Sequence, residues 1–307
     1  MFFLKKVAIL ANCQGGVYKK LLLDNKEFSK KFDFIDLPLV HTLNQDDKDG
    51  IYKKIKNVDI LFYQPLNSKK LEPFFANNLK KHMPLFSNLI SIPSLYFNFY
   101  HCHTIYILKD NLPKFEIDYH DINILLAWYY NIPQIELLAI ISLDDYYQKN
   151  FLKKIAQINF NEIIEREKEV DIKYFNFVHK YYESEKLFHT FNHPANKILL
   201  HVFEQMQKSL NLKTNELNYS TNLLGNIFLS TYPSLNKFLD KKNTELLLEY
   251  NIFGKVTEQD KMIEKYYKYY DMYENEIKDW TKNNLIKTNN EIELLIIENF
   301  KNKFKIK

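Results

Sequence analysis

Residues 7–16 read VAILANCQGG, and this short segment sets the class of the protein. The apolar run of residues 7–12 is typical of a strand buried on both faces of a parallel sheet. Gly15 and Gly16 then open a helical pattern that continues to Leu23. A strand that passes directly into a helix is the first half of a βαβ unit, so we expect an α/β fold.

The next eighty or so residues repeat this alternation of strand and helix. Strands are predicted at residues 32–40, 58–63 and 88–92, and helices at residues 46–56 and 69–81. This order indicates a doubly wound, mainly parallel sheet in the N-terminal part of the chain. Ligands of such sheets bind outside the carboxyl ends of the strands. Those ends carry Cys13, Gln64 and Ser94, so we expect a site there.

From residue 118 onward the pattern is largely helical. A period of 3.6 is found at residues 120–130, 137–141, 144–158, 161–182 and 194–210. Two Phe-rich strands are expected before them, at residues 94–100 and 105–108, and one or two amphipathic helices after them, at residues 260–307. We therefore predict three parts: an α/β sheet core with the strand-end site (1–115), a helical part that completes the site (116–215) and a C-terminal helical appendage (216–307).

The charge balance excludes a dedicated nucleic-acid binder, because the chain has 42 basic and 38 acidic residues, which gives a net charge of only +4. An anionic substrate or cofactor is compatible with this balance. Two cysteines give no disulfide framework, no export signal is found, and no apolar run approaches the roughly 20 residues of a membrane span. We expect a soluble, cytoplasmic protein. The lysine-rich residues 301–307 indicate a frayed terminus or, alternatively, a weak membrane-surface contact.

Cys13 is the first candidate for a reactive residue. Two of the five glycines follow it closely, and glycines after a buried strand allow a tight turn and close approach of a ligand to the backbone. The start of the next helix offers free N–H groups and the positive end of a dipole, which would lower the pKa of the thiol and hold an oxyanion or a phosphate. The alternative is a small cysteine packed after a core strand. The dinucleotide-binding spacing of glycines is absent.

His193 is the second candidate, in the segment Asn192-His193-Pro194. Proline suits the first turn of a helix, and Asn192 or Thr190 would cap that helix. A histidine in a loop at a helix start can serve as a general base. The alternative is that the three residues form only a capping sequence.

Two further features of the sequence are compatible with either a structural or a functional role. His101-Cys102-His103, with His120-Asp121 downstream, contains residues that zinc prefers, but a second cysteine pair is missing and we expect no metal. His120-Asp121 would instead start a helix. Arg166 is the sole arginine of the chain, which hints at a phosphate or carboxylate partner; the alternative is an intrahelical pair with Glu162 or Glu169.

The order of these motifs resembles the WcbI family of bacterial polysaccharide-biosynthesis enzymes. The resemblance covers roughly residues 7–212. It rests on Asn12-Cys13-Gln14-Gly15, Tyr63-Gln64-Pro65, Ile92-Pro93-Ser94, Tyr96-Phe97, Tyr100-His101, Tyr119-His120-Asp121, Arg166-Glu167 with Asp171, and Leu187-Phe188 through Asn192-His193-Pro194. After His101 the family tends to show Pro-Asp, whereas this chain has Cys102-His103, which puts the role of an acidic residue there in doubt.

The resemblance implies an acetyltransferase that uses acetyl-coenzyme A (acetyl-CoA) as co-substrate and acetylates a sugar hydroxyl of a capsular or surface polysaccharide precursor. Cys13 and His193 then form the reactive pair, with Asn192 as an orienting group. The remaining assignments are Gln14, Gly15, Gln64, Ser94 and His101 to the substrate or oxyanion, and Gly16, Arg166 and His120 to the cofactor. Cys13 either takes the acetyl group or only helps to bind the oxyanion.

Two other classes of function stay open at this stage. One is a carbohydrate esterase related in layout to the SGNH hydrolases, which also place a nucleophile after the first strand; no Asp-x-x-His is found at the late position that those enzymes use. The other is a non-catalytic carbohydrate- or nucleotide-binding protein in which Cys13 only packs.

Overall fold

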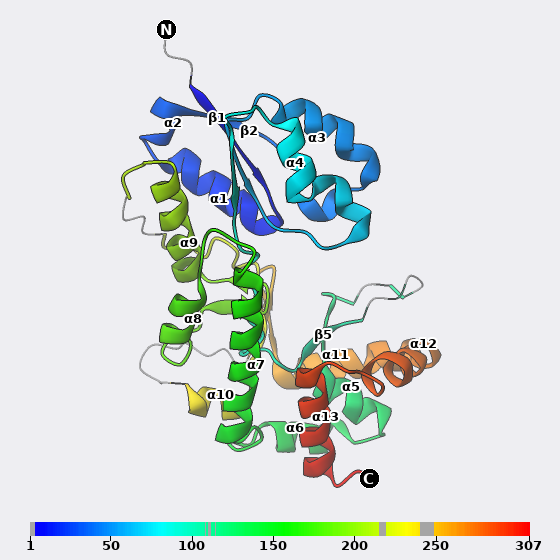
Figure 1. Ribbon diagram of the computed structural model, residues 1–307. Coiled ribbons are helices and arrows are strands. Elements are labelled where there is room, and N and C mark those ends of the chain that lie inside the picture. The colour runs from blue at the N-terminus through cyan, green and yellow to red at the C-terminus, as the bar shows by residue number, and fades with distance from the viewer. Residues whose placement is uncertain (1–3, 108, 110–111, 114, 215–218, 240–248) are drawn as a thin grey trace. The chain divides into compact units, whose positions relative to one another are not determined.

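The computed structural model describes residues 4–107, 109, 112–113, 115–214, 219–239 and 249–307. The chain divides into two compact units, and each draws on separate stretches of sequence (Figure 1). Unit 1 comprises Met1–Tyr96, Glu162–Lys180 and Pro194–Leu224; unit 2 comprises Phe97–Asn161, Tyr181–His193 and Gly225–Lys307. The three-part division predicted from the sequence stays a prediction.

A parallel sheet of four strands, in the order β2-β1-β3-β4, forms the centre of unit 1. Val7 of β1 lies opposite Phe34 of β2 and Ile60 of β3, and Leu61 of β3 lies opposite Leu89 of β4. The strands are β1 (Lys5–Leu10), β2 (Phe32–Ile35), β3 (Ile60–Tyr63) and β4 (Asn88–Ser91). The predicted α/β class and the mainly parallel sheet are confirmed.

Helices cover both faces of this sheet (Figure 1). On one face, Ala8, Leu10 and Leu61 pack against Ile51 and Ile55 of α3 and against residues of α4. On the other face, α1 lies on β1 and is flanked by α9. The helical elements of unit 1 are α1 (Cys13–Asp24), α2 (Phe28–Lys31), η1 (Val40–Thr42), η2 (Gln45–Asp47), α3 (Lys48–Ile55), η3 (Lys69–Phe74), α4 (Ala76–His82), α8 (Phe175–Tyr181, whose last residue belongs to unit 2) and α9 (Asn196–Ser209).

The predicted and observed elements of unit 1 differ in extent, and three of the differences have a clear structural cause. The strand expected at residues 32–40 ends at Ile35, and the backbone N–H of Val40 donates to the carbonyl of Ala11 instead of continuing a ladder. The helix expected at residues 69–81 is two elements, because the extended backbone of Phe75 (φ −71°, ψ 151°) separates η3 from α4. The helix expected from Pro194 begins at Asn196 with Ala195 as its N-cap, so the predicted capping role of Asn192 or Thr190 is wrong.

Unit 2 is mostly helical, with short antiparallel strands. Its helices are α5 (Ile122–Tyr129), α6 (Gln134–Ile141), most of α7 (Lys149–Glu167), α10 (Pro233–Phe238), α11 (Gln259–Met272), α12 (Glu274–Trp280), a π-helical turn η4 (Thr281–Leu285) and α13 (Glu291–Phe304). Its strands are β5 (Thr104–Tyr106), β6 (Tyr119–Asp121), β7 (Phe188–Thr190), β8 (His193–Pro194, whose last residue belongs to unit 1), β9 (Ile227–Phe228), β10 (Glu249–Ile252) and β11 (Lys255–Glu258). The predicted helical character of the C-terminal region is confirmed, whereas the sheet β11-β10-β9 was not expected.

Several other predicted boundaries are wrong, and for residues 94–100 the reason is that tertiary packing, rather than a regular period, buries the aromatic side chains. Residues 94–100 form no strand; they run as a loop that buries Phe97, Phe99 and Tyr100. The strand expected at residues 105–108 is β5, and residue 108 lies outside the described residues. One helix, α7, spans the gap between two predicted ones and ends at Glu167. Residues 260–307 hold three α-helices rather than one or two.

Gly15 allows α1 to lie directly on β1, and this generates a test. A Cβ atom at Gly15 would stand 2.8 Å from the Cβ of Ala11, whereas one at Gly16 would meet nothing within 4 Å. We therefore expect Gly15→Ala to lower the free energy of unfolding by about 1–3 kcal/mol through overpacking. The matched variant Gly16→Ala should leave it unchanged or raise it by up to ~1 kcal/mol, because alanine favours helix. Urea unfolding of both variants would contradict this account if the two losses were equal.

Candidate active site

The turn between β1 and α1 is built around Asn12. Its side-chain oxygen accepts from the N–H of Gln14 at 3.0 Å, which makes Asn12 the N-cap of α1. The carbonyl of Asn12 accepts from the N–H of Gly15 at 2.9 Å. Cys13 is the first residue of the helix, and its side chain is partly exposed. The thiol thus stands at the rim of the sheet, at the start of a helix.

Gln64 and Ser94 tie this turn to the ends of the neighbouring strands. The side-chain oxygen of buried Gln64 accepts from the N–H of Asn12 at 2.9 Å, and its amide nitrogen donates to the carbonyl of Pro93 at 3.2 Å. The side-chain amide of Asn12 donates to the hydroxyl of Ser94 at 3.1 Å. The structure therefore brings the residues that follow β1, β3 and β4 together at one edge of the sheet.

Gln14, Gly15 and Gly16 play different parts in this turn. The side chain of Gln14 is fully buried and binds both the N–H and the carbonyl of Leu95, at 2.9 Å each. Gly15 is buried against β1, as described above. Gly16 is exposed, with open space where a side chain would be. Of the three, Gly16 offers bare backbone that a ligand can approach.

The predicted pKa of the thiol is wrong in direction. Burial raises the pKa of Cys13 above its ordinary value, because the thiolate loses hydration. Hydrogen bonds from the backbone N–H groups of Gln14 and Cys13 act in the opposite sense and only partly offset this effect. At neutral pH Cys13 is therefore a protonated thiol, and its activation requires a base. The helix start is visible in the sequence, whereas the desolvation of the sulfur depends on packing that only the folded structure shows.

His193 and Asn192 belong to unit 2, whereas Cys13 belongs to unit 1. Burial lowers the pKa of His193, so its imidazole is neutral at pH 7, and its Nδ1 is buried without a hydrogen-bond partner among the described residues. The side-chain oxygen of Asn192 accepts from the hydroxyls of Tyr119 (2.9 Å) and Thr190 (2.8 Å). The hydroxyl of Thr190 also accepts from the N–H of His193 at 3.2 Å. Asn192 thus anchors the loop that presents His193.

The other candidate histidines are buried inside unit 2. His101 is fully buried, which lowers its pKa well below the ordinary value, and nearby Lys186 adds to this effect. Burial also lowers the pKa of His120 to about 3, and its Nδ1 lies 3.0 Å from the hydroxyl of Tyr270. Asp121 caps α5 by accepting from two backbone N–H groups, as expected for a residue that starts a helix. Among the described residues, no group of three or more His, Cys, Asp or Glu side chains could hold a metal ion.

Arg166 forms the intrahelical pair that the sequence offered as one alternative. Its guanidinium pairs with Glu162, one turn earlier in α7, and lies over the ring of Tyr96 at 4.8 Å from the centroid. The same side chain lines a cavity of about 350 Å³ in unit 1. The other lining residues are Pro65, Leu66, Asn67, Pro93, Ser94, Glu167, Glu169, Val170 and Tyr174.

This cavity contains residues that the sequence analysis did not select, chiefly Asn67, Glu169 and Tyr174. Asn67 follows the third predicted strand by four residues, so the rule that strand ends carry ligands could have found it. Glu169 and Tyr174 lie beyond α7, about a hundred residues away in sequence, and no pattern links them to the sheet. Only the folded unit shows that they share a cavity with Ser94.

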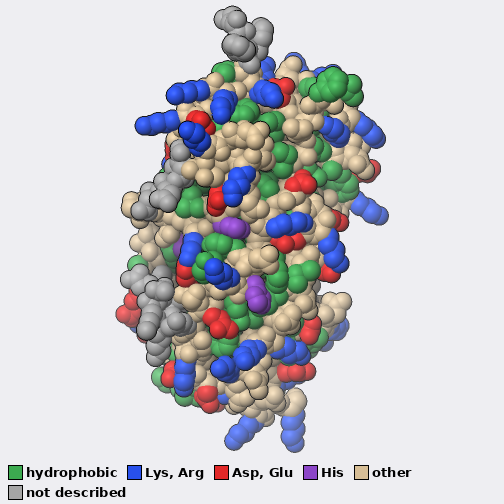
Figure 2. Space-filling view, turned by 60° about the vertical axis from the view of Figure 1, so that its left-hand side comes forward, with side chains coloured by type: hydrophobic (Ala, Val, Ile, Leu, Met, Phe, Trp, Pro, Cys, Tyr) green, Lys and Arg blue, Asp and Glu red, His purple; other side chains and the backbone are tan. Residues whose placement is uncertain are grey.

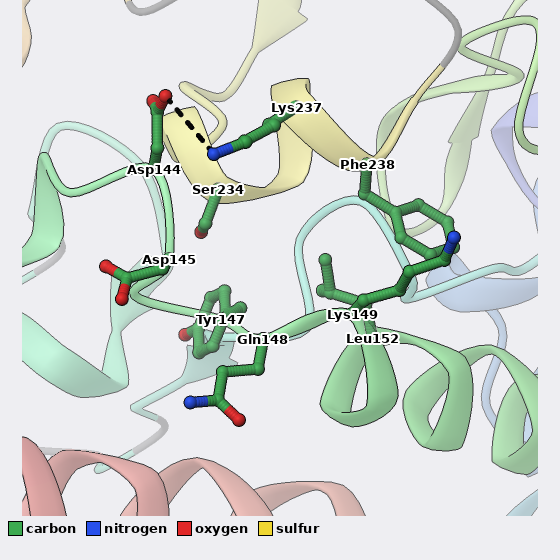
Figure 3. Close-up of a pocket in the computed structure, with 9 residues that line it drawn as sticks. All are labelled: Asp144, Asp145, Tyr147, Gln148, Lys149, Leu152, Ser234, Lys237 and Phe238. Carbon is green, nitrogen blue, oxygen red and sulfur yellow. Dashed lines mark ion pairs between the residues drawn. The ribbon is translucent and has the colours of Figure 1, made fainter.

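A second cavity, of about 340 Å³, lies in unit 2 (Figure 3). Asp144 and Lys237 form an ion pair of 3.8 Å on its wall, and the close-up shows Ser234 beside this pair and Tyr147 next to Gln148. Neither aspartate nor lysine was a sequence candidate, and the cavity includes none of the predicted site residues.

The face drawn in Figure 2 shows lysine and carboxylate side chains interspersed rather than gathered in one basic patch. This distribution agrees with the near balance of charge in the sequence. None of the helices in the described part of the chain is long and apolar enough to cross a membrane.

A family model described as "Polysaccharide biosynthesis enzyme WcbI" matches residues 6–215, which is more than half of the chain and includes the Cys13 turn and the His193 loop. The chain belongs to the WcbI family. A comparison with curated proteins found no match.

A solved structure of a WcbI protein has the same fold, with a TM-score of 0.82 over 98% of this chain and 100% of the other, at 17% sequence identity. It is described as a novel polysaccharide biosynthesis enzyme in its native form, without a disulfide bond between coenzyme A and one of its cysteines. The family model ends at residue 215, whereas the similarity of fold extends through the C-terminal helices of this WcbI chain.

The state of the two thiols can be tested by alkylation. We expect iodoacetamide to modify Cys13 in the native protein, with a rate that rises with pH to a midpoint above that of an ordinary cysteine, because burial raises the pKa of this thiol. Cys102 is an internal control: it is buried, with a pKa raised to about 12, and should stay unmodified until the protein unfolds. Peptide mass spectrometry at several pH values measures both. A midpoint below 8 would show that Cys13 is an activated thiolate and would contradict a pKa raised by burial.

Proposed function

We propose that this WcbI protein is a coenzyme A-dependent acetyltransferase, which moves an acetyl group from acetyl-CoA to a sugar hydroxyl in the synthesis of a capsular or surface polysaccharide. The observation that carries the proposal is the partly exposed thiol of Cys13, at the start of α1 and at the carboxyl edge of a parallel sheet, in a member of this family. The mention of coenzyme A and a cysteine for the WcbI structure of the same fold supports the choice of co-substrate.

The surroundings of Cys13 support acyl chemistry. The backbone N–H groups of Cys13 and Gln14 donate towards the sulfur, so a negative charge that develops beside it meets donors that are already in place. Gly16 exposes backbone at the first turn of the helix, where an anionic group of a co-substrate is favoured by the helix dipole. Hydrogen bonds from Gln64 and Asn12 hold the turn in place, so its donors do not have to reorient during the reaction.

Two routes are compatible with these groups. In the covalent route, a base takes the thiol proton of Cys13 as its sulfur attacks the acetyl carbonyl carbon, and the thiolate of coenzyme A leaves and takes up that proton. The sugar hydroxyl then attacks the new thioester, gives its proton to a base and regenerates the thiol. In the direct route, a base takes the hydroxyl proton as the sugar oxygen attacks the acetyl carbonyl carbon of acetyl-CoA, and the turn binds the oxyanion. The C–S bond then breaks, and the thiolate of coenzyme A leaves and takes up the proton from the base.

His193 is the base in both routes. Its pKa is lowered by burial, so the imidazole is neutral and able to accept a proton at pH 7. Asn192 acts by holding the loop through Tyr119 and Thr190. The raised pKa of Cys13 favours the direct route, because the covalent route needs a second proton transfer to activate the thiol.

The surroundings of the other assigned residues support them unequally. Ser94 is exposed and bonded to Asn12, so it remains a substrate-binding candidate. Arg166 already pairs with Glu162, and His101 and His120 are enclosed in unit 2, so their roles stay predictions without support from their contacts.

Binding of the co-substrate is the first test. Coenzyme A and acetyl-CoA should each raise the melting temperature of the full chain, since a ligand at about 100 times its Kd stabilises a folded protein by roughly 2.7 kcal/mol. ADP, which lacks the pantetheine arm, is the control and should give a smaller shift. If neither thioester nor free coenzyme A shifts the melting temperature, the proposal is wrong.

Two variants separate the routes. In the covalent route, peptide mass spectrometry finds an acetyl group on Cys13 of the wild type after incubation with acetyl-CoA. Cys13→Ser removes this acetylation, and transfer to the sugar collapses. In the direct route no acetyl-Cys13 forms, and Cys13→Ser retains most of the transfer. In both, His193→Ala lowers the rate by about 10²–10⁴, as expected for loss of a general base.

The same assay of acetyl transfer can also contradict both routes together. If neither Cys13→Ala nor His193→Ala lowers transfer, both routes fail. Release of acetate from acetyl esters without any dependence on coenzyme A would identify a hydrolase instead.

A further inference from the structure

The cavity of unit 1 opens at the carboxyl edge of the sheet, next to the Cys13 turn. Pro65, Leu66 and Asn67 follow β3, and Pro93 and Ser94 follow β4. Ser94 is the link to the turn, because its hydroxyl accepts from Asn12, the residue before Cys13. A molecule in this cavity therefore lies beside the segment that holds the reactive thiol.

The opposite wall of the cavity is held in place by hydrogen bonds. The carboxylate of Asp171 accepts from both the N–H and the hydroxyl of Ser91, at 2.8 Å each, and the N–H of Asp171 donates back to the same hydroxyl at 2.9 Å. Glu167 accepts from the N–H groups of Tyr174 and Phe175 at the start of α8. These bonds fix residues 167–174 against the end of β4, so the cavity is formed before a ligand binds.

The charged groups of the cavity argue against a polyanion. Its lining has one guanidinium, Arg166, against two carboxylates, Glu167 and Glu169. Arg166 is paired with Glu162 and stacked on Tyr96, so it is not free to bind phosphate. The phosphates of coenzyme A would meet a net negative wall, and the whole cofactor is too large for about 350 Å³, a volume near the lower end of the range of small-molecule sites.

The remaining groups suit a polyol. The carboxylate of Glu169 is exposed and makes no hydrogen bond or ion pair within the described part of the chain. Asn67 offers both a donor and an acceptor. Pro65, Leu66 and Val170 add apolar surface to the lining, which suits the C–H groups of a sugar ring. The two oxygens of a carboxylate can accept hydrogen bonds from two neighbouring sugar hydroxyls, and a side-chain amide can both donate to and accept from them.

We propose that this cavity binds the acceptor sugar through Glu169 and Asn67, and that its negative lining selects uncharged or amino sugars over acidic ones. The inference rests on the proposed acetyl transfer, and it assigns the acceptor a place separate from that of coenzyme A. An acidic sugar is disfavoured because its carboxylate would be desolvated beside Glu167 and Glu169.

Saturation-transfer difference NMR on the full chain tests this assignment. The probes are the methyl α-glycosides of glucose, galactose and mannose, together with glucosamine and glucuronic acid. At least one neutral or amino sugar should receive saturation, and glucuronic acid should receive none. Glu169→Gln should weaken the binding of that sugar about tenfold, the effect expected from losing a hydrogen bond to a charged group. Asn67→Trp should abolish it by filling the cavity.

The matched control is Glu165→Gln, an exposed residue nearby in α7 that pairs with Lys168 and does not line the cavity. It should bind the sugar as the wild type does, and all three variants should keep the melting-temperature shift caused by coenzyme A. The inference is overturned if no sugar of the panel binds, if glucuronic acid binds as well as the neutral sugars, or if Glu165→Gln weakens binding as much as Glu169→Gln.

The outcome for coenzyme A separates this inference from the proposed function. A wild-type protein that is stabilised by coenzyme A but binds no sugar retains the acetyltransferase proposal and loses the acceptor cavity. A protein that binds the sugar but is not stabilised by coenzyme A loses the acetyltransferase proposal instead.

Discussion

The bend from β1 into α1 takes only two residues, Ala11 and Asn12, and the rest of the site depends on it. Such a sharp bend presses the first turn of α1 onto β1, which is possible because Gly15 has no side chain. It also exposes backbone groups that need partners, and Gln64 supplies one by accepting from the N–H of Asn12. The bend, the ends of β3 and β4 and the start of the helix are therefore one hydrogen-bonded structure.

The chemistry of Cys13 follows from this constraint. A helix start favours the thiolate, and the N–H groups of Gln14 and Cys13 act in that direction. The close packing that makes the bend possible also removes water from the sulfur, and desolvation outweighs the donors. The result is a thiol that is held in a polar turn but protonated at neutral pH. The covalent route of the proposed reaction therefore needs a base to activate the thiol, whereas in the direct route the base acts on the sugar hydroxyl.

In unit 2 a network of buried hydroxyls has a comparable structural role. Asp121 caps α5 and accepts from the hydroxyl of Tyr232 at 2.8 Å, while Asn123 binds the hydroxyls of Tyr146, Tyr147 and Tyr232. Each of these tyrosines is buried and satisfies its hydroxyl inside the unit, so a tyrosine-rich composition becomes a packed core. The imidazole Nε2 of His103 lies 3.6 Å from the carboxylate of Asp121, at the edge of this network.

The sequence by itself determined the alternation of strands and helices in the first hundred residues, because an apolar run and a 3.6 period are local properties of the chain. It also placed Cys13, Gln64 and Ser94 at the ends of parallel strands, and such ends share an edge in any sheet of this kind. Tertiary structure alone decided the direction of the pKa of Cys13, the enclosure of His101 and His120, and the cavity that joins Asn67 to Glu169. Desolvation and cavity shape depend on neighbours a hundred residues away, and no local pattern carries that information.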